Sequence, residues 1–259
     1  MIGVERVDFI GVPVMDLAAG DEYFGETLGL FERNPRSSER WVEYEAPNVT
    51  LALVPNAYTG REHEPLPFAA IAVRVDDVEE ERQRLSERGV EFPRKSFDSG
   101  VCTGAPFTAL DGNGMLLHHR YAPFSDGASP EAPRGRVDFM AVPTRDRRRA
   151  EEFYGGTLGL ERNPRSTETW VEYETGNVTL AFVDPSSAGV EFHAVPDGTI
   201  ALRVPDVEAA MAQLQAAGFE FPLGTIDSGV CHLAPFTDPD GNGLMFHRRY
   251  APYSDGSLP

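Results

Sequence analysis

The chain has 259 residues, of which 41% are hydrophobic and 25% charged, so it can bury the cores of two ordinary domains. Its formal net charge of -18 repels phosphate backbones and anionic lipids, so we expect neither a nucleic-acid partner nor a membrane partner. Residues 1–14 carry charges where a signal peptide has its apolar core, and no run approaches the length of a membrane span. These features predict a cytoplasmic protein.

Residues 6–54 predict the order β-α-β-β-β. Residues 6–14 alternate between polar and apolar, as a strand does, and lead to Asp16, which is a suitable N-cap. The helix predicted from there covers residues 16–28 and ends at a glycine. Three strands follow, over residues 30–34, 41–45 and 49–54.

A loop rich in proline, glycine and charge at residues 55–67 separates this module from a second one of the same order. Its predicted elements are a strand at 68–75, a helix at 77–88, a short strand at 90–93, and strands at 101–108 and 115–121. The last two strands flank the turn Asp111-Gly112-Asn113-Gly114, whose residues tolerate positive φ.

The whole pattern then occurs a second time. DSGVCTGAPFTALDGNGMLLHHRYAP at residues 98–123 returns as DSGVCHLAPFTDPDGNGLMFHRRYAP at residues 227–252. We therefore predict two tandem domains, residues 1–124 and 136–259, joined by a Pro/Gly/Ser linker at 125–135. The fold class is α+β, with four βαβββ modules and curved mixed sheets.

Four such modules in two pairs resemble the vicinal oxygen chelate superfamily, which includes glyoxalase I, bleomycin-resistance proteins and extradiol dioxygenases. The resemblance covers nearly all of the chain. It is carried by the opening "DL...YF...LGL", the mid-domain "AVRVDDVE" and the late "DGNG". It implies that modules pair into cup-shaped sheets that hold a small-molecule ligand. It also implies a pseudo-dimer within one chain, with a homodimer as a further alternative.

Metal-dependent members of this superfamily hold a divalent ion with His, Gln or Glu on the first strand of each module and Glu on the last. By the resemblance, these positions are Phe9, Phe139, Ala70, Thr199, Thr50 or Ala52, Thr179 or Ala181, Leu116 and Met245. None of these side chains is a good ligand. We therefore expect no metal site and no cofactor. The alternative is a displaced site for Fe, Mn, Ni or Zn.

His118 and His247 stand two residues beyond Leu116 and Met245, and they share a face with them because strand side chains alternate. They are the candidate catalytic residues, as acid or base. The candidate ligand-binding residues are Phe9, Trp41, Glu43, Arg120, Phe139, Trp170, Glu172, His232 and Arg249.

Each candidate also has a simpler structural interpretation. A histidine near a strand end is often hydrogen-bonded structure, a glutamate on an edge strand can face solvent, and aromatic rings can simply pack. Cys102 and Cys231 are interpreted as small buried apolar residues, because the sequence shows no base beside either of them.

Two functions remain open. The first is a metal-free small-molecule-binding protein, similar to the bleomycin-resistance branch, which sequesters an aromatic or cationic ligand. The second is a lyase, isomerase or dioxygenase that uses a displaced metal, or His118 and His247 as acid and base. The sequence contains no phosphate-binding loop, no G-x-S-x-G and no C-x-x-C, so it does not favour other enzyme classes.

Overall fold

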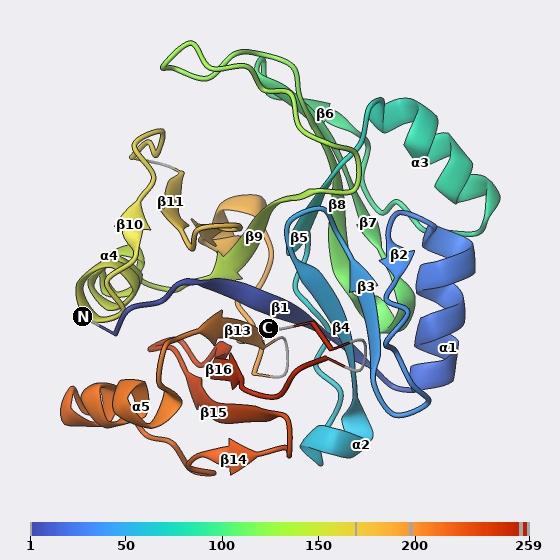
Figure 1. The fold of residues 1–259 in the computed structure, drawn as a ribbon. Coiled ribbons are helices and arrows are strands. Elements are labelled where there is room, and N and C mark those ends of the chain that lie inside the picture. Colours follow the sequence, from blue (N-terminus) through green and yellow to red (C-terminus); the bar gives the residue numbers. More distant parts are fainter. Residues whose placement is uncertain (1, 169, 197–198, 254–255, 258–259) are drawn as a thin grey trace.

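The structure, a computed structural model, describes residues 2–168, 170–196, 199–253 and 256–257. Within this part of the chain, two mixed eight-stranded sheets carry helices on their outer faces (Figure 1). The α+β class and the four βαβββ modules predicted from the sequence are confirmed.

The first repeat contains the elements β1 (Arg6–Val14), α1 (Leu17–Glu22), a π-helical segment (Tyr23–Leu28), β2 (Glu32–Arg33), β3 (Val42–Glu45), β4 (Thr50–Pro55), α2 (Asn56–Thr59), β5 (Ile71–Arg74), α3 (Val78–Glu87), β6 (Phe97–Asp98), β7 (Cys102–Thr108) and β8 (Gly114–Arg120). The helix predicted over 16–28 is thus half α and half π, and it ends as predicted at Gly29, which has φ +57°. The strand predicted at 90–93 is wrong, because only the single bridge between Glu91 and Thr108 forms there.

The second repeat contains β9 (Val137–Pro143), α4 (Arg147–Glu151), a π-helical segment (Glu152–Thr157), β10 (Glu161–Arg162), β11 (Val171–Glu174), β12 (Thr179–Val183), β13 (Ile200–Arg203), α5 (Val207–Ala216), β14 (Ile226–Asp227), β15 (Cys231–Thr237) and β16 (Gly243–Arg249). Its helices begin at positions equivalent to those of the first repeat, where Asp77 caps α3. Asp206, for example, caps α5 by accepting a hydrogen bond of 2.9 Å from the backbone N–H of Ala209.

Each sheet takes one module from each repeat. The first sheet has the order β14-β15-β16-β13-β1-β4-β3-β2, and the second has the order β10-β11-β12-β9-β5-β8-β7-β6. The antiparallel pairs β1–β13 and β5–β9 form the central seams. The sequence repeats therefore differ from the structural units, since each sheet contains half of each repeat.

The DGNG turns hold the modules together at close range. The fully buried Asn113 donates 2.7 Å to the carbonyl of Pro13 and accepts 3.0 Å from the N–H of Leu66. A side chain at Gly114 would place its Cβ 2.1 Å from the carbonyl oxygen of Pro67, so only glycine fits. This motif of the resemblance is thus structural.

One hydrophobic core, built mainly from the strand faces that meet the helices, joins the two sheets. Helix α3 contacts β7 and β8, and α5 contacts β15 and β16 in the same way. The opposite faces of the sheets are left to form the cups described below. Across the described residues, no helix reaches the length and apolarity that crossing a membrane requires.

Candidate functional site

On each sheet, the face turned away from the helices carries an equivalent group of residues, and we call each of these faces a cup. Cup A lies on the face of the first sheet that carries Phe9, and cup B lies on the face of the second sheet that carries Phe139. In cup A a small apolar cluster, separate from the main core, lines the floor. It consists of Phe9, Ala52, Ala201, Trp41 and Met245. In cup B the strand pairing brings together the equivalent residues, Phe139, Ala181, Ala72, Trp170 and Leu116.

The aromatic residues of each floor meet edge to face. The ring centroids of Phe9 and Trp41 lie 5.8 Å apart, with an interplanar angle of 82°. Those of Phe139 and Trp170 lie 5.3 Å apart at the same angle. The four aromatic residues predicted as ligand-binding are thus brought together in two pairs. Each phenylalanine also meets its histidine edge to face, with the ring centroids 5.5 Å apart in both sheets.

A β-bulge brings an aspartate into each cup. Val7 pairs with Leu202 and Phe9 with Ala201, so Asp8 is the extra residue of β1. Asp138 is the extra residue of β9 in the same way. A bulge breaks the alternation of side chains and is common next to functional sites. Because strict alternation would place Asp8 and Phe9 on opposite faces, sequence reasoning missed both aspartates.

The backbone groups at the bulges are satisfied across the repeats. The side chain of Asn177 accepts 2.9 Å from the N–H of Val7 and donates 2.8 Å to its carbonyl. Asn48 does the same for Val137, at 3.0 and 2.9 Å. These reciprocal bonds replace those that the ladder loses, and they fix the backbone beside each aspartate.

In cup A, Asp8 binds the catalytic candidate His247. Its Oδ2 lies 2.5 Å from Nδ1 of His247, and its Oδ1 accepts 2.7 Å from Nε of Arg203. Burial of His247 alone would lower the pKa of the imidazole, but the bonds to Asp8 and Cys231 raise it to about 9. Burial likewise raises the pKa of Asp8, and His247 and Arg203 outweigh it, so the net shift is downward. His247 is thus an imidazolium at neutral pH.

In cup B, Asp138 binds His118 in the same geometry. Its Oδ2 lies 2.6 Å from Nδ1 of His118 and accepts 2.8 Å from Nε of Arg74. Burial lowers the pKa of His118, and the bonds to Asp138 and Cys102 reverse that shift and raise it. Both catalytic candidates therefore lie in the cups and are oriented by a buried carboxylate.

The two cysteines lie beside these histidines. On the β15–β16 pair, Cys231 is opposite Arg249 and Leu233 is opposite His247, so the thiol and the imidazole share a face. Each histidine is close enough to its cysteine for the two to interact, which raises the pKa of His247 and lowers the pKa of the Cys102 thiol. The interpretation of both cysteines as inert apolar residues is therefore wrong. Sequence reasoning missed the neighbouring base because the histidine lies on the next strand.

Two carboxylates line the cups beside the tryptophans. Trp41 donates 2.7 Å from Nε1 to Glu43, and Trp170 donates 2.7 Å to Glu172. Burial raises the pKa of both carboxyls, although the tryptophan bonds oppose the shift. Glu43 and Glu172 are half-buried, so they do not form the wet side of an edge strand.

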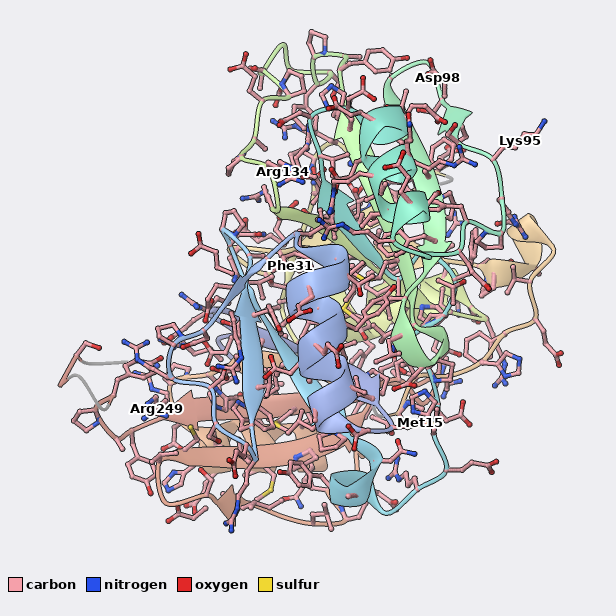
Figure 2. All side chains as sticks on the ribbon, turned by 90° about the vertical axis from the view of Figure 1, so that its right-hand side faces the viewer. Met15, Phe31, Lys95, Asp98, Arg134 and Arg249 are labelled. Carbon is pink, nitrogen blue, oxygen red and sulfur yellow. The ribbon has the colours of Figure 1, made fainter. Side chains whose placement is uncertain are left out.

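Arg120 and Arg249 are held by the segments that follow β8 and β16. We call residues 121–128 strap B, and residues 250–253 together with 256–257 strap A. The guanidinium of Arg249 stacks 4.3 Å from the ring centroid of Tyr253, and Arg36 lies 4.2 Å from the same centroid. Tyr253 therefore bridges Arg249, which ends β16, and Arg36, which lies between β2 and β3 of the same sheet. Figure 2 shows Arg249 at the rim of this sheet, far from Asp98 of the other one.

Strap B makes the same kind of sandwich. The ring of Phe124 lies 4.3 Å from the guanidinium of Arg120 and 3.7 Å from that of Arg165. Arg165 also pairs with Asp126, at 2.8 Å. In each sheet one aromatic side chain, Tyr253 or Phe124, thus links the arginine at the end of the last strand to an arginine of the opposite arm.

Two residues singled out in the sequence lie outside the cups. His232 pairs with Arg248 on the opposite face of β15 from Cys231, and its ring packs 4.9 Å from that of Tyr250. Ala70, one of the expected metal-ligand positions, packs in the main core, and Ala72 takes the place opposite Phe139. In cup A the residue opposite Phe9 is Ala201, and Thr199 precedes β13.

The side chains at the cup floors do not fit a metal ion. The strand positions of the superfamily ligands carry the apolar cluster of cup A and its equivalents in cup B. Among the residues that the structure describes, no three His, Cys, Asp or Glu side chains are grouped so that they could hold an ion. We therefore derive no reaction step through a metal.

An apolar hollow of about 430 Å³ extends one end of cup B. Ala141 and Pro143 lie two and four residues beyond Phe139 on β9, and Val183 lies two beyond Ala181 on β12. By alternation these residues share the face of the cup. The remaining lining comes from the two crossovers between modules, at residues 64–68 and 190–195.

Comparison with known proteins agrees with this architecture. A family model for the glyoxalase/bleomycin resistance protein/dioxygenase superfamily matches residues 6–116 and again residues 136–246. The chain belongs to this superfamily. The two matches correspond to the two repeats, so the superfamily assignment covers all four modules.

Solved structures of the superfamily share the fold. Glyoxalase I from Zea mays has a TM-score of 0.65 at 18% identity, over 93% of this chain and 92% of that one. A candidate dioxygenase from Bacillus subtilis subsp. subtilis str. 168 has a TM-score of 0.66 at 13% identity, over 99% and 89%. No curated protein sequence matches the chain. At these identities the likeness concerns the fold alone.

Proposed function

We propose that the chain is a small-molecule-binding protein that holds a flat, apolar or cationic ligand in each cup, without the metal of the superfamily. The observation that carries this proposal is the apolar floor of Phe9, Ala52, Ala201, Trp41 and Met245, which occupies the strand positions of the metal ligands. A floor of aromatic and aliphatic side chains with a few polar groups above it is the usual make-up of a ligand pocket.

The polar groups define what the ligand can be. Glu172 uses one carboxylate oxygen for the N–H of Trp170, whereas Glu43 accepts from Trp41 at one oxygen and, at 3.1 Å, from Asn34 at the other. Both carboxylates lie beside the aromatic walls. A cationic or hydrogen-bond-donating edge of a flat ligand would compensate the burial of these carboxylates. The net charge of -18 adds a weak attraction for cations. We place this binding in the reducing cytoplasm, where Cys102 and Cys231 stay free thiols.

A second candidate function is supported by the aspartate-bound histidines. With a pKa of about 9, His247 carries a proton at neutral pH and can act as a general acid. A lyase or isomerase that donates this proton to a bound substrate would need no metal. This candidate keeps the same cups and adds chemistry to them.

The two tryptophans provide the test. The chain has only Trp41 and Trp170, one in each cup, so a Trp41→Phe variant reports on cup B and a Trp170→Phe variant reports on cup A. Titration with proflavine, which is planar and cationic, and with 2-naphthol, which is planar and neutral, is expected to quench each tryptophan with saturation. Phe9→Ala should weaken binding at Trp41 and leave binding at Trp170 unchanged, and Phe139→Ala should do the reverse.

The proposal fails if neither probe quenches either tryptophan saturably. Metal analysis of protein purified without chelator tests whether the cups bind their ligand without a metal. Stoichiometric Fe, Mn, Ni or Zn that is lost in a His118→Ala/His247→Ala variant would contradict metal-free binding. Activity that survives chelator and disappears in that variant would favour the acid/base enzyme.

A further inference from the structure

A tight turn places each cysteine at the start of its strand. In cup B, Asp98 accepts 2.8 Å from the N–H of Gly100, whose φ of +81° suits glycine, and 2.7 Å from the hydroxyl of Tyr121. The hydroxyl of Ser99 accepts 3.1 Å from the N–H of Cys102 and lies 3.1 Å from its Sγ. The thiol is therefore held in place by its own loop before any ligand binds.

The histidine of each cup is oriented toward that thiol. Nδ1 of His118 is bonded to Asp138, so only Nε2 is left to act on Cys102, which lies on the same face of the β7–β8 pair. His247 stands between Asp8 and Cys231 in the same way. A thiol, an imidazole and a carboxylate in this order form the arrangement that activates a cysteine nucleophile.

Positive charge surrounds the sulfur. Nη1 of Arg249 lies 3.9 Å from Sγ of Cys231, and Arg120 is the strand partner of Cys102. Burial raises the pKa of the Cys102 thiol, but the bonds to His118 and Ser99 and the charge of Arg120 outweigh it and lower the pKa. Within the described part of the chain, Nε of both arginines is buried without a hydrogen-bond partner. A hydrogen-bond acceptor on a bound ligand would satisfy the Nε–H of each arginine.

We propose that Cys102 and Cys231 are nucleophiles that add covalently to a flat α,β-unsaturated carbonyl compound bound in the cups. The inference rests on the proposed function, because the acceptor must first lie against the aromatic floor. Three features select this class of ligand. A thiolate is a good nucleophile toward an activated alkene, a guanidinium faces the charge that develops on oxygen, and a histidinium stands ready with a proton.

The step needs no other reagent. The cysteine reacts as a thiolate paired with the imidazolium, so the histidine already holds the proton that the thiol has released. Sγ donates an electron pair to the β-carbon, which forms the S–C bond. The π electrons of the C=C bond move through the carbonyl to its oxygen, which becomes an enolate beside the guanidinium. The imidazolium then protonates the α-carbon. One thiol and one alkene are converted into one thioether, and nothing is oxidised or reduced.

Two maleimides test the proposal on the whole chain. N-phenylmaleimide carries a flat aromatic group and N-methylmaleimide does not, and peptide mass spectrometry separates the adducts of Cys102 and Cys231. At pH 7 we expect N-phenylmaleimide to alkylate Cys102 at least about ten-fold faster than in the denatured chain, and with saturation. A His118→Gln variant should react more slowly at Cys102, because loss of the imidazolium raises the pKa of the thiol and lowers its thiolate fraction at pH 7.

A matched control and a second measurement keep the result unambiguous. His119 lies next to His118 but on the other face of β8, where it bonds the carbonyl of Val75 at 2.9 Å, so His119→Gln should leave the rate unchanged. If His118→Gln does not fold, the pH profile of the unmodified chain decides. Its Cys102 rate should level off at a lower pH than in the denatured chain.

The outcomes separate this inference from the proposed function. Rates equal to those of the denatured chain, together with saturable tryptophan quenching, would overturn the nucleophile and leave ligand binding intact. Fast alkylation by both maleimides without saturation would support activated thiols and overturn the flat-ligand cup. Fast, saturable reaction with the phenyl reagent that depends on His118 supports both.

Discussion

Cups A and B have the same polar groups but differ in what supports them. Asp8 of cup A has three cationic partners. Besides Arg203 and His247, Nε of Arg6 lies 3.2 Å from its Oδ1. The structure gives Asp138 of cup B two such partners, Arg74 and His118, and both bind the same carboxylate oxygen. The groups that could act on a ligand are thus identical in kind, while the charge that holds them differs.

The outer walls differ in another way. In cup B the ring of Phe97 covers Gly104, whose added Cβ would lie 2.5 Å from the ring. In cup A the equivalent pair is Ile226 and Leu233. Cup B thus pairs a large residue with glycine, whereas cup A pairs two residues of intermediate size. The two pairs fill a similar volume with a different shape. The comparison indicates that the two cups offer the same polar chemistry to ligands of different outline.

The largest expected effect comes from removing the bulge aspartates. Asp8→Ala leaves a buried histidinium and Arg203 without their carboxylate, and breaking such a pair costs about 3–5 kcal/mol of unfolding free energy. Asp138→Ala should cost less, because its carboxylate has fewer cationic partners. Urea denaturation at pH 6 measures both.

Asp126→Ala is the matched control for these variants. Asp126 also binds an arginine, Arg165, but the pair is exposed, so its loss should change stability little. If Asp8→Ala and Asp138→Ala both lost as little unfolding free energy as Asp126→Ala, that result would contradict the difference between the cups.

The second-largest effect is expected in the pH dependence of the unfolding free energy, to which His247 of cup A contributes. The pKa of His247 is about 9 in the folded chain and 6.5 in the unfolded chain. The stabilisation it brings is therefore complete below pH 6.5 and is lost as the pH rises toward 9. The loss of unfolding free energy over this window is about 3 kcal/mol. His247→Gln should flatten the curve, as measured by urea denaturation at pH 6, 7.5 and 9.

His118→Gln serves as the counterpart in cup B. The pKa of His118 is also raised, with the same sign, so this variant should remove part of the slope as well. A curve that stays as steep in both variants would show that other groups cause it.

The wall of cup B can be converted into that of cup A. Gly104→Leu alone forces the ring of Phe97 aside and brings the new side chain close to Leu116, at a cost of about 1 kcal/mol. Adding Phe97→Ile should recover most of that loss, because the pair then matches Ile226 and Leu233. A double-mutant cycle in urea measures the coupling, and additive costs would disprove the exchange of volume.

The smallest effect is expected at the straps. Phe124→Ala removes two cation–π contacts, from Arg120 and Arg165, and should cost about 1 kcal/mol or less. Phe124→Tyr copies strap A, where Tyr253 makes the same sandwich, and should be neutral in thermal unfolding. A loss in the tyrosine variant as large as in the alanine variant would show that the straps are not equivalent.

The sequence was sufficient for most of the fold because periodicity and end signals act locally. The alternation in WVEYE placed Trp41 and Glu43 on one face, and both do line the cup. The aspartate N-caps and the glycine stops located the helices for the same reason. The predicted strand at 90–93 failed because this segment meets its neighbour β7 at a single bridge, between Glu91 and Thr108.

The features that the sequence could not predict depend on contacts between residues far apart in the chain. A bulge that turns Asp8 into the cup reverses the alternation on which the argument depends, and it is fixed by Asn177 from the other repeat. The pairing of Cys231 with His247 requires the register of two strands. The repeated RVDF and DSGVC segments did mark both places, but a duplication repeats every residue and so does not select the important ones.

The exchange of modules between the sheets has an evolutionary consequence. Since β1–β4 share a sheet with β13–β16, neither repeat holds a complete cup. An unfused ancestor with one repeat would need two copies to form its binding sites, and every mutation would then appear in both. Fusion into one chain removes that constraint, because the gene can alter one cup alone. The unequal walls of cups A and B are the kind of divergence that such an arrangement permits.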